Sequence, residues 1–408
     1  MEVDYRATQE ETVRDWSFPD VARYRSRVQE VQAALGASGI DVLVASGGDT
    51  RRYLGGVDGL ASIRPIWLVL PAKGEAEFVS PRLETAEIRA QSWIPVTEEW
   101  VEWDDPAFPS RTHLAALNRA LERLFPSGSQ VIAADFYQST ATSVDVLRAR
   151  FGSENVRDAS HLLLAARLVK DPGVVDVVRR SADVAMFQYR TIAATLRPGL
   201  TEWEIARIAR DAGMERAAYW WGDEQAYSPH MPGVALIQSG RGRASRAHGL
   251  ASTRVIQDGE IVEVCLCGMP FFGHSIGFDR PLLAGDGDVP DDVRRVLRIA
   301  EEAQAAALAA VAPGKTAGDV HAAAFEVVRQ NGLVGALRHR TGRGLGSSEV
   351  EFPELKHGEP TVLQPGMIFA VEPGIYVEGI VGARFGDTVL VTETGYEVLT
   401  DATIGHDL

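Results

Sequence analysis

The sequence predicts an α/β domain over residues 1–165 and an α+β domain over residues 166–408 that is built from two pseudo-symmetric halves. Three observations lead to this prediction. The length of 408 residues fits two or three domains of ordinary size. The first domain alternates short apolar runs with helical stretches, and in the second a pattern of helix ends and starts recurs 115 residues later, from Pro198 to Pro313.

Apolar runs and helical periodicities define the elements of the first domain. Short runs predict strands at residues 40–45, 66–70, 77–79 and 131–134. Apolar residues at helical spacing predict helices at residues 24–35, 112–124 and 143–151. Gly47 and Gly48 predict a turn, and residues 51–64 predict a loop-rich edge after it.

The second domain begins with a helix whose start is marked by Asp171 and Pro172, an N-cap followed by proline. Proline and glycine at residues 198 and 199 end this helix, and Thr201 with Glu204 forms the capping box of the next one. At the second copy, Thr316 is the cap. Each copy precedes a strand-rich stretch, at residues 234–283 and 350–399, so we expect a site in the crevice between two sheets. A chance recurrence of helix boundaries is the alternative.

Composition and charge narrow the class of protein. A net charge of −15 argues against a protein that reads the backbone of nucleic acids, since such proteins concentrate lysine and arginine. Cys265 and Cys267, two residues apart on one predicted strand, exclude a disulfide framework. The first residues lack signal-peptide features, and no apolar run reaches the roughly 18 to 20 residues that span a bilayer. We therefore expect a cytoplasmic protein with no nucleic-acid or membrane partner.

One carboxylate interrupts the apolar run at residues 367–376, which predicts a strand. Burying the charge of Glu372 is costly without a partner, so we expect a cation, a polar group or a metal beside it. An edge strand on which this glutamate faces water is the alternative. The next predicted strand, residues 382–392, offers Arg384 and Asp387 as neighbours.

Three segments resemble a known family: EPGIY from residue 372, G-x-R-x-x-DTVLVTETGYEVLT from residue 382, and TGRGLGSSEVEFPEL from residue 341. They resemble the catalytic domain of the pita-bread family, which includes aminopeptidase P, prolidase, methionine aminopeptidase and the metal-free creatinase. The resemblance covers about residues 165 to 400, and the N-terminal domain resembles the one shared by creatinase, prolidase and aminopeptidase P. It implies an α/β N-terminal domain and an α+β pita-bread domain with two pseudo-symmetric halves.

The resemblance also implies five metal-ligand positions, because the metallopeptidases of this family hold two metal ions with two Asp, one His and two Glu. In this sequence the positions hold, in order, Cys265, Ile276 or Gly277, Arg343, Glu372 and Gly386. A guanidinium beside Glu372 would repel a cation, so we predict no dinuclear metal centre and no cofactor. A single zinc ion bound by Cys265, His274 and Glu372 is disfavoured by the same arginine.

The resemblance to creatinase implies catalysis without a metal ion. His248 falls on the catalytic histidine of that enzyme, and Asp279 and Glu372 fall on two active-site carboxylates. Arg64 matches the arginine that reaches the neighbouring subunit's active site and binds the substrate carboxylate, so a homodimer is implied. The alternatives are a surface histidine at position 248 and a solvated loop charge at position 64.

Further residues suggest the kind of substrate. Arg64, Arg343 and Arg384 together favour an anionic substrate or an oxyanion. Trp221, in the aromatic segment of residues 218–223, precedes the site strand together with Tyr227 and His230, and these side chains are candidates for the wall of a compact pocket. Core packing of this segment is the alternative, of equal weight.

We therefore predict a metal-independent hydrolase of a non-peptide C–N bond in a small carboxylate-bearing molecule, similar to creatinase or ectoine hydrolase. His248 would act as its general acid and base. The alternatives are a lyase, cyclase or dehydratase of specialised metabolism that uses the same pocket, a metal-dependent Xaa-Pro peptidase, or a catalytically inactive binding module.

Overall fold

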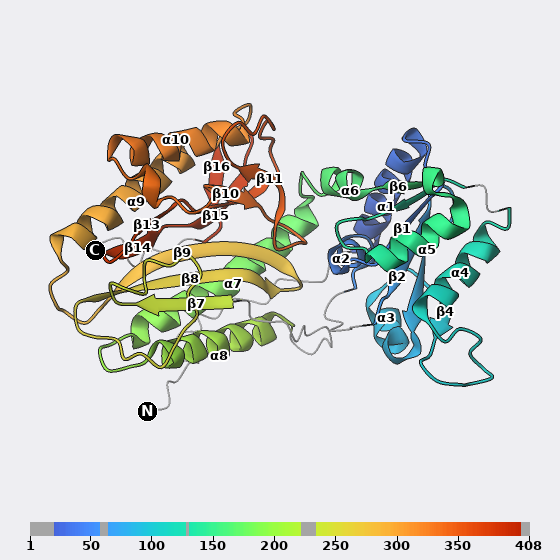
Figure 1. Ribbon diagram of the computed structural model, residues 1–408, viewed down its shortest axis with the longest axis horizontal. Coiled ribbons are helices and arrows are strands. Elements are labelled where there is room, and N and C mark those ends of the chain that lie inside the picture. The colour runs from blue at the N-terminus through green and yellow to red at the C-terminus, as the bar shows by residue number, and fades with distance from the viewer. Residues whose placement is uncertain (1–19, 58–63, 128–129, 222–233, 401–408) are drawn as a thin grey trace. The chain divides into compact units, whose positions relative to one another are not determined.

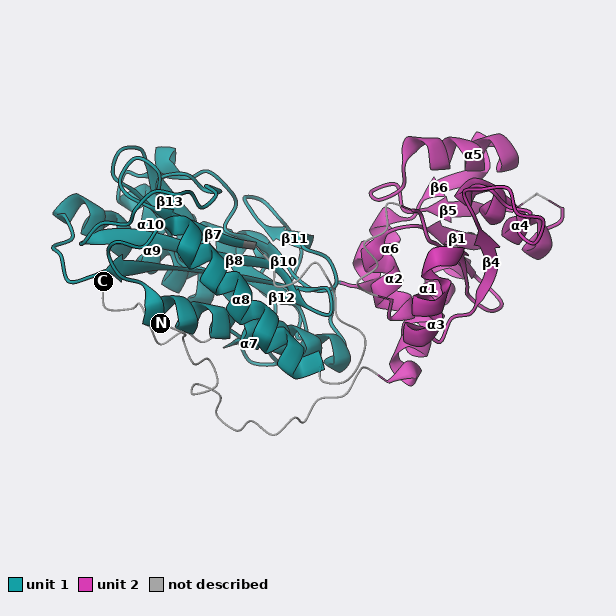
Figure 2. Ribbon diagram, turned by 90° about the horizontal axis from the view of Figure 1, so that it is seen from below, with its two compact units in different colours: residues 1–17, 168–408 teal, residues 18–167 magenta. Residues whose placement is uncertain are grey.

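The computed structural model describes residues 20–57, 64–127, 130–221 and 234–400 (Figure 1). The chain separates into two compact units, an N-terminal unit that ends at Arg167 and a C-terminal unit that continues from Leu168 (Figure 2). None of the helices in the described part of the chain combines the length and the apolar character that a membrane crossing requires.

The N-terminal unit is an α/β domain around one mixed six-stranded sheet with the order β4-β3-β2-β1-β5-β6. Its strands are β1 Val42–Ala45, β2 Trp67–Pro71, β3 Glu77–Pro81, β4 Val96–Trp100, β5 Ile132–Ala134 and β6 Val156–Asp158. Its helices are α1 Val21–Ala37, α2 Gly48–Gly55, α3 Thr85–Gln91, α4 His113–Leu124, α5 Ala141–Phe151 and α6 Ser160–Ala166. Leu43 packs toward α1, while its neighbours Val42 and Val44 pack toward α4 and α5, so both faces of the sheet are covered.

The prediction of a turn and a loop-rich edge after residue 47 is wrong in part, because Gly48–Gly55 forms the helix α2. Tertiary contacts override the low helix propensity of glycine here. Leu54 is fully buried in the core of the unit, and Asp49 at the start of the helix is ion-paired with Arg167 at 2.5 Å. These contacts join residues more than one hundred positions apart, which local sequence patterns do not report.

The C-terminal unit repeats one arrangement, two helices followed by strands. The first half contains α7 Pro172–Thr195, α8 Glu202–Trp221, β7 Val234–Ser239, β8 Glu260–Phe271 and β9 His274–Ala284. The second half contains α9 Asp291–Ala309, α10 Ala317–Gln330, β10 Gly342–Gly344, β11 Glu351–Leu355, β12 Ile368–Val371, β13 Gly374–Val377, β14 Val381–Arg384, β15 Asp387–Val391 and β16 Tyr396–Val398. Single 3-10 turns lie at Arg82–Glu84, Ser153–Asn155 and Val334–Ala336.

The helix starts of this unit have the predicted caps. The carboxylate of Asp171 accepts hydrogen bonds from the backbone N–H groups of Gly173 and Val174, at 2.8 and 3.1 Å. Thr201 and Glu204 exchange backbone and side-chain hydrogen bonds at 2.8 to 3.1 Å, and Thr316 forms the equivalent capping box at α10. Each box satisfies N–H groups that a helix leaves without partners at its first turn.

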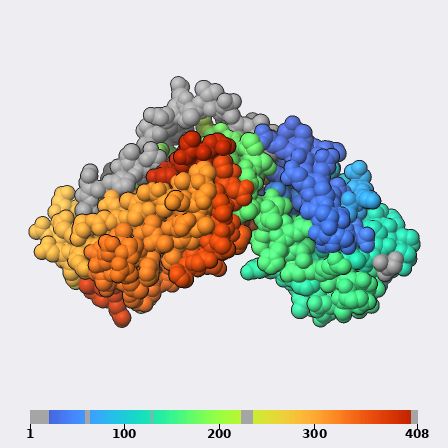
Figure 3. All heavy atoms as spheres, turned by 90° about the horizontal axis from the view of Figure 1, so that it is seen from above, coloured from blue at the N-terminus to red at the C-terminus, as the bar shows by residue number. Residues whose placement is uncertain are grey.

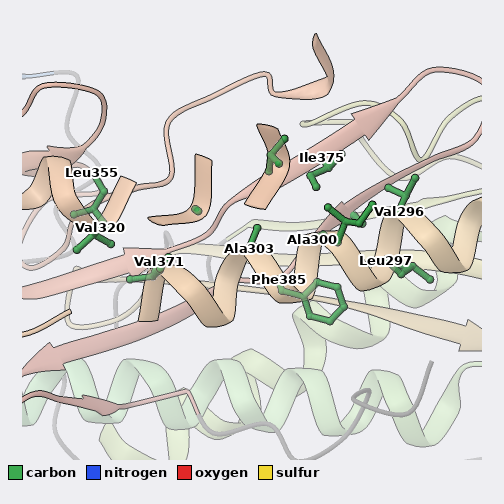
Figure 4. Packing of buried hydrophobic residues seen from close by; sticks show 14 of the residues in the cluster. Val296, Leu297, Ala300, Ala303, Val320, Leu355, Val371, Ile375 and Phe385 are labelled. Carbon is green, nitrogen blue, oxygen red and sulfur yellow. The ribbon is translucent and has the colours of Figure 1, made fainter. Parts of the chain in front are cut away.

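Two hydrophobic cores fill this unit, and each contains residues of both halves. Helices α7 and α8 pack against the three-stranded sheet β7-β8-β9, and α9 and α10 pack against the strands of the second half. Figure 4 shows Ala300 and Ala303 of α9 close to Val371, Ile375 and Phe385. The residues of α9 and α10 form much of one outer face of this unit (Figure 3, orange).

Two apolar runs that the sequence predicts as continuous strands are each broken, and these predictions are wrong. The run at residues 367–376 leaves the five-stranded sheet β11-β10-β12-β15-β16 after Val371, and continues in the two-stranded sheet β13-β14. Pro373, which has no backbone N–H to donate, lies at this break. The run at residues 382–392 breaks at Gly386, which exchanges two backbone hydrogen bonds of 3.0 Å with Asp279 of β9. The two halves therefore meet at these breaks.

Candidate active site

Four buried charged side chains meet where the halves join, and we call them the site cluster: Asp279, Arg343, Glu372 and Arg384. Arg343 of β10 is ion-paired with Glu372, which follows the end of β12. Arg384, at the end of β14, is ion-paired with Asp279 of β9 at 2.7 Å. A charge in a protein interior needs a partner, and each carboxylate of the cluster has a guanidinium beside it. The cation expected beside Glu372 is thus an arginine.

The two carboxylates of the site cluster differ in the direction in which their pKa values are shifted. Burial raises the pKa of Asp279 to about 6, since the attraction of Arg384 only partly offsets the loss of water and the nearby charge of Glu372 adds to the rise. Burial also acts to raise the pKa of Glu372, but the charges of Arg343 and Arg384 outweigh it and lower the value. Of the two carboxylates, Asp279 therefore takes up a proton first as the pH falls toward 6, whereas Glu372 stays ionised.

Several oxygens in and beside the cluster lack hydrogen-bond donors among the residues that the structure describes. They are both oxygens of Asp279, the Oε2 atom of Glu372, and the Oε2 atom of Glu263, a buried neighbour on β8. Glu263 uses its other oxygen to accept the backbone N–H of Arg384 at 3.1 Å, and burial raises its pKa. Unpaired buried oxygens cost free energy, so a hydrogen-bond donor that binds beside them is favoured.

His248 lies beside the site cluster, on a turn that follows β7. The side chain is largely exposed, yet partial burial lowers its pKa. The charges of Arg384 and Arg343 lower the pKa further, whereas Glu372 raises it. A neutral imidazole at pH 7 can accept a proton, so the position and charge state of His248 suit a general base.

The segment that carries His248 is anchored by Glu202, a residue that sequence reasoning missed. This carboxylate is fully buried at the start of α8. It accepts hydrogen bonds from the backbone and hydroxyl groups of Ser239 and Ser252, which lie on either side of the turn, at 2.6 to 3.0 Å. Arg243, within the turn, is ion-paired with Glu202 at 3.1 Å. No sequence pattern near position 202 indicates these contacts, because Ser239 and Ser252 lie 37 and 50 positions away.

Two thiols border the site cluster. Cys265 and Cys267 of β8 pair with Asp279 and Gly277 of β9, so the four residues share one face of the hairpin. The two sulfur atoms are 3.1 Å apart. Cys265 is buried, and its hydrogen bond to Cys267 together with burial raises its pKa. His274 pairs with Phe271 at the far end of the hairpin and is about 17 Å along the strand from Asp279, so the three-ligand zinc set does not assemble.

The remaining predicted residues lie elsewhere. Trp221 is buried at the end of α8, and its ring packs against Phe271 and Phe272 with centroids 4.7 and 5.6 Å away. Tyr227 and His230 lie outside the described residues. Arg64 belongs to the N-terminal unit, where Nε and Nη2 donate to one oxygen of Glu102 at 2.9 and 2.7 Å.

A second histidine near the cluster was also missed. His339 Nδ1 lies 2.7 Å from the carbonyl oxygen of Arg340, and its Nε2 lies 2.9 Å from the hydroxyl of Tyr376. If Nδ1 donates to that carbonyl, Nε2 accepts the Tyr376 proton. Burial lowers the pKa of His339, and Arg384 lowers it further. This histidine holds the phenol of the buried Tyr376 in place, next to the end of β12.

Comparison with known proteins identifies the family. Residues 176–393 match metallopeptidase family M24, and residues 27–169 match the creatinase/prolidase N-terminal domain. The chain belongs to metallopeptidase family M24, with the pita-bread fold that the sequence motifs predict.

Full-length relatives extend this finding. The chain is 40% identical to the agropine synthesis cyclase of Rhizobium rhizogenes over 388 residues, which are 94% of this chain and 97% of that protein. It is 32% identical to a Mycobacterium tuberculosis protein named probable dipeptidase PepE, over 92% of this chain and 94% of the relative. The crystal structure of dipeptidase PepE from Mycobacterium ulcerans superposes with a TM-score of 0.79 at 29% identity, and covers 95% of this chain and 98% of that one. Proteins of this family are thus enzymes of at least two kinds.

The metal centre that the family implies does not fit the residues at the site. Arg343 occupies one ligand position, and its guanidinium binds Glu372, which is the single family ligand that the sequence keeps. The structure does bring ligand atoms of three residues within 4.8 Å of one another, those of Cys265, Cys267 and Asp279. However, Asp279 is ion-paired with Arg384. Two buried guanidinium groups within this set oppose the binding of a cation.

Proposed function

We propose that this chain is a cyclase, an enzyme that closes a ring within a small carboxylate-bearing molecule. The observation that carries the proposal is the identity of 40% with agropine synthesis cyclase across 94% of the chain. The site supports it, because Arg343 stands at a position where the family resemblance implies a metal ligand, and Arg384 and His248 lie close to it. The predicted hydrolase of a C–N bond has weaker support, and the cyclase that the sequence left as an alternative is favoured over it.

Hydrolysis and cyclisation need the same side chains in this site. In both reactions a base removes a proton from a nucleophile that attacks a carbon atom, and an acid protonates the leaving group. The nucleophile is water in a hydrolase, whereas in a cyclase it is a hydroxyl or amine of the substrate itself. Holding this group next to the reacting carbon supplies much of the rate enhancement, since the attack is then intramolecular.

Each residue has a role in this proposal. His248 takes the proton of the internal nucleophile and returns it to the leaving group. Glu372 orients the imidazole and the nucleophile, and Asp279 holds Arg384 in place. The positive charges of Arg343 and Arg384 stabilise the oxyanion that forms as the carbon is attacked. Arg64 of a second copy in a homodimer would bind the substrate carboxylate.

The decisive experiment uses water labelled with heavy oxygen and the open-chain precursor of agropine as the first substrate. A cyclase yields a ring-closed product that contains no solvent oxygen. A hydrolase must transfer an oxygen atom from water to its product, so a labelled, ring-open product would overturn the cyclase in favour of the hydrolase.

A second experiment tests the general base. His248→Ala should abolish ring closure without loss of folded structure, whereas His161→Ala, an exposed histidine of the N-terminal unit, should leave the rate unchanged. A near-normal rate in His248→Ala would remove this residue from the mechanism while leaving the reaction open.

Dipeptidase activity is the second candidate, and the 32% identity to the Mycobacterium tuberculosis relative favours it. It predicts cleavage of Xaa-Pro dipeptides that depends on added Mn²⁺. Because Arg343 occupies a metal-ligand position, we expect no such cleavage by the purified protein, with or without the ion.

A further inference from the structure

We propose that Gln238 is a positioning residue for the general base, because its amide holds the backbone on both sides of His248. This inference rests on the proposed function, in which His248 moves the proton, and it applies to any reaction that uses this imidazole. Gln238 lies near the end of β7 and is buried. The acid–base scheme above leaves this polar side chain without a role.

The strand register places Gln238 on the face of the sheet that carries part of the site cluster. Gln238 pairs with Glu263 of β8, and Cys265, two residues further along β8, lies on the same face. Cys265 in turn pairs with Asp279 of β9. The side chain of Gln238 therefore connects the face that holds Asp279 to the turn that follows β7.

The amide of Gln238 contacts the turn on either side of His248. Its Nε2 donates to the carbonyl oxygen of Arg246 at 3.0 Å. A Cβ atom at Gly249 would lie 2.0 Å from Gln238 Oε1 and 2.5 Å from its Cδ, so the amide packs directly against this glycine. The φ angle of Gly249 is outside the left-handed region, so the amide, and not backbone strain, excludes a side chain there.

This support is needed because the imidazole is largely exposed, so packing around the ring does little to hold it. The ends of the turn have a separate anchor in Glu202, which binds Ser239 and Ser252. These two serines are nine and four residues from His248. Gln238, in contrast, holds the residue two positions before the histidine and the residue directly after it.

The position of a general base determines its rate. The base must lie within hydrogen-bond reach of the proton that it removes, and a displacement of about 1 Å can lower a rate about 100-fold. Loss of the Gln238 contacts should therefore lower kcat. KM should change little, because Gln238 acts through His248 and the residues proposed to bind the substrate are unaltered.

The test uses two substitutions that disturb these contacts from opposite sides, with the open-chain precursor of agropine as substrate. Gln238→Leu keeps most of the bulk of the side chain and removes its hydrogen bond to Arg246. Gly249→Ala adds a methyl group where the amide oxygen lies. Each should lower kcat by about 10- to 100-fold and leave KM within about twofold of normal.

The matched control is Gly242→Ala, on the same turn, where an added Cβ has no atom within 4 Å. This variant should keep the normal kcat and KM. A normal kcat in both Gln238→Leu and Gly249→Ala, in a protein whose turnover depends on His248, would overturn the positioning role.

A rescue experiment tests whether the two residues act through one contact. Gln238→Ala removes the amide and leaves room for a methyl group at position 249. Adding Gly249→Ala to Gln238→Ala should therefore lower kcat no further. If the two losses multiply instead, the substitutions act independently, and the assignment is wrong.

Hydrogen exchange tests the same contact without a substrate. The backbone N–H groups of Arg243, Ala244 and Arg246 are hydrogen-bonded within the turn. They should exchange about tenfold faster in Gln238→Leu and Gly249→Ala, whereas the helices and sheets keep their protection, which shows that the variants fold. Unchanged exchange in the turn would overturn the positioning role, whatever reaction the protein catalyses.

The outcomes separate this inference from the proposed function. If ring closure depends on His248 but not on Gln238 or Gly249, the positioning role is wrong and the cyclase stands. If the product is ring-open and labelled with solvent oxygen, and its rate falls in Gln238→Leu and Gly249→Ala, the cyclase is wrong and the positioning role is supported.

Discussion

Two ionic clusters lie on opposite faces of β9, and they differ in how fully their oxygens are paired. Adjacent residues of the strand, Asp279 and Arg280, point to opposite faces. Arg280 binds both oxygens of Asp387 at 3.0 and 3.1 Å, and we call the group around Asp387 the core cluster. Its carboxylate also accepts from Gln304 at 2.6 Å and from Thr400 at 3.0 Å.

The carboxylates of the site cluster have fewer partners than Asp387. Asp279 has one ion-pair partner, and Glu372 Oε2 has no donor among the residues that the structure describes. A carboxylate held by four hydrogen bonds from three side chains is fixed in place and serves stability. A carboxylate with an unpaired oxygen can still bind a ligand or accept a proton. The rest of the fold must offset the free energy that the unpaired oxygen costs. The comparison predicts that substitutions in the site cluster reduce turnover, whereas substitutions in the core cluster reduce stability.

The largest effect should come from Glu372→Gln, which keeps the shape of the side chain and removes its charge. We expect turnover to fall by about 10²- to 10⁴-fold, the range by which acid–base partners contribute to rates. The folded state should persist, as judged by circular dichroism. A rate within a few-fold of normal would show that the site cluster does not serve the reaction.

The core cluster is broken by Asp387→Ala, which leaves the buried charge of Arg280 without its carboxylate. Removing one partner of a buried ion pair costs about 3–5 kcal/mol of stability. Urea unfolding should report this loss, whereas turnover per folded molecule should stay close to normal. Full stability with lost turnover would reverse the roles assigned to the two clusters.

The pH dependence of stability sharpens the comparison. The pKa of Asp279 is about 6 in the folded protein against an ordinary value of 3.8, so between these values the native state holds a proton that the unfolded chain has released. Its contribution to stability is therefore complete at low pH, and is lost as pH rises from about 4 to about 6. Asp279→Asn should lack this slope in urea unfolding experiments. Identical slopes in the two proteins would contradict the raised pKa.

The smallest effect is expected from Thr400→Val, which keeps the shape of the side chain. It removes one donor to Asp387 and the acceptor of the Thr388 backbone N–H. A hydrogen bond to a charged group is worth about 1.5–3 kcal/mol, and three other contacts to the carboxylate remain. The free energy of unfolding should fall by about 1.5 kcal/mol, the lower end of this range, with no change in turnover. A loss as large as that of Asp387→Ala would mean that the core cluster depends on this one hydroxyl.

Much of the fold could be predicted from local patterns. Four of the six strands of the N-terminal sheet, β1, β2, β3 and β5, follow from short apolar runs, whereas β4 and β6 were missed. The capped starts of α7, α8 and α10 follow from the cap residues Asp171, Thr201 and Thr316. The cost of burying a charge also indicated that a cation, a polar group or a metal would lie beside Glu372, and the structure shows that it is Arg343. These features depend on residues close together in the sequence, which is where pattern reasoning is strongest.

The missed features depend on contacts between distant segments. Glu202 anchors the His248 turn through Ser252, fifty residues away, and nothing near position 202 reports that contact. The strand breaks at Pro373 and Gly386 follow from the meeting of two sheets, where a Cβ on Gly386 would lie 2.5 Å from Asp279 Oδ2.

The central claim is that fixed guanidinium charges replace metal ions in this site. Elemental analysis of the protein, purified and then equilibrated with excess Mn²⁺ and Zn²⁺ before removal of free ions, tests it most directly. The account predicts far less than one bound ion per chain. Two ions per chain would contradict it and would return the protein to the metal-dependent peptidases of its family.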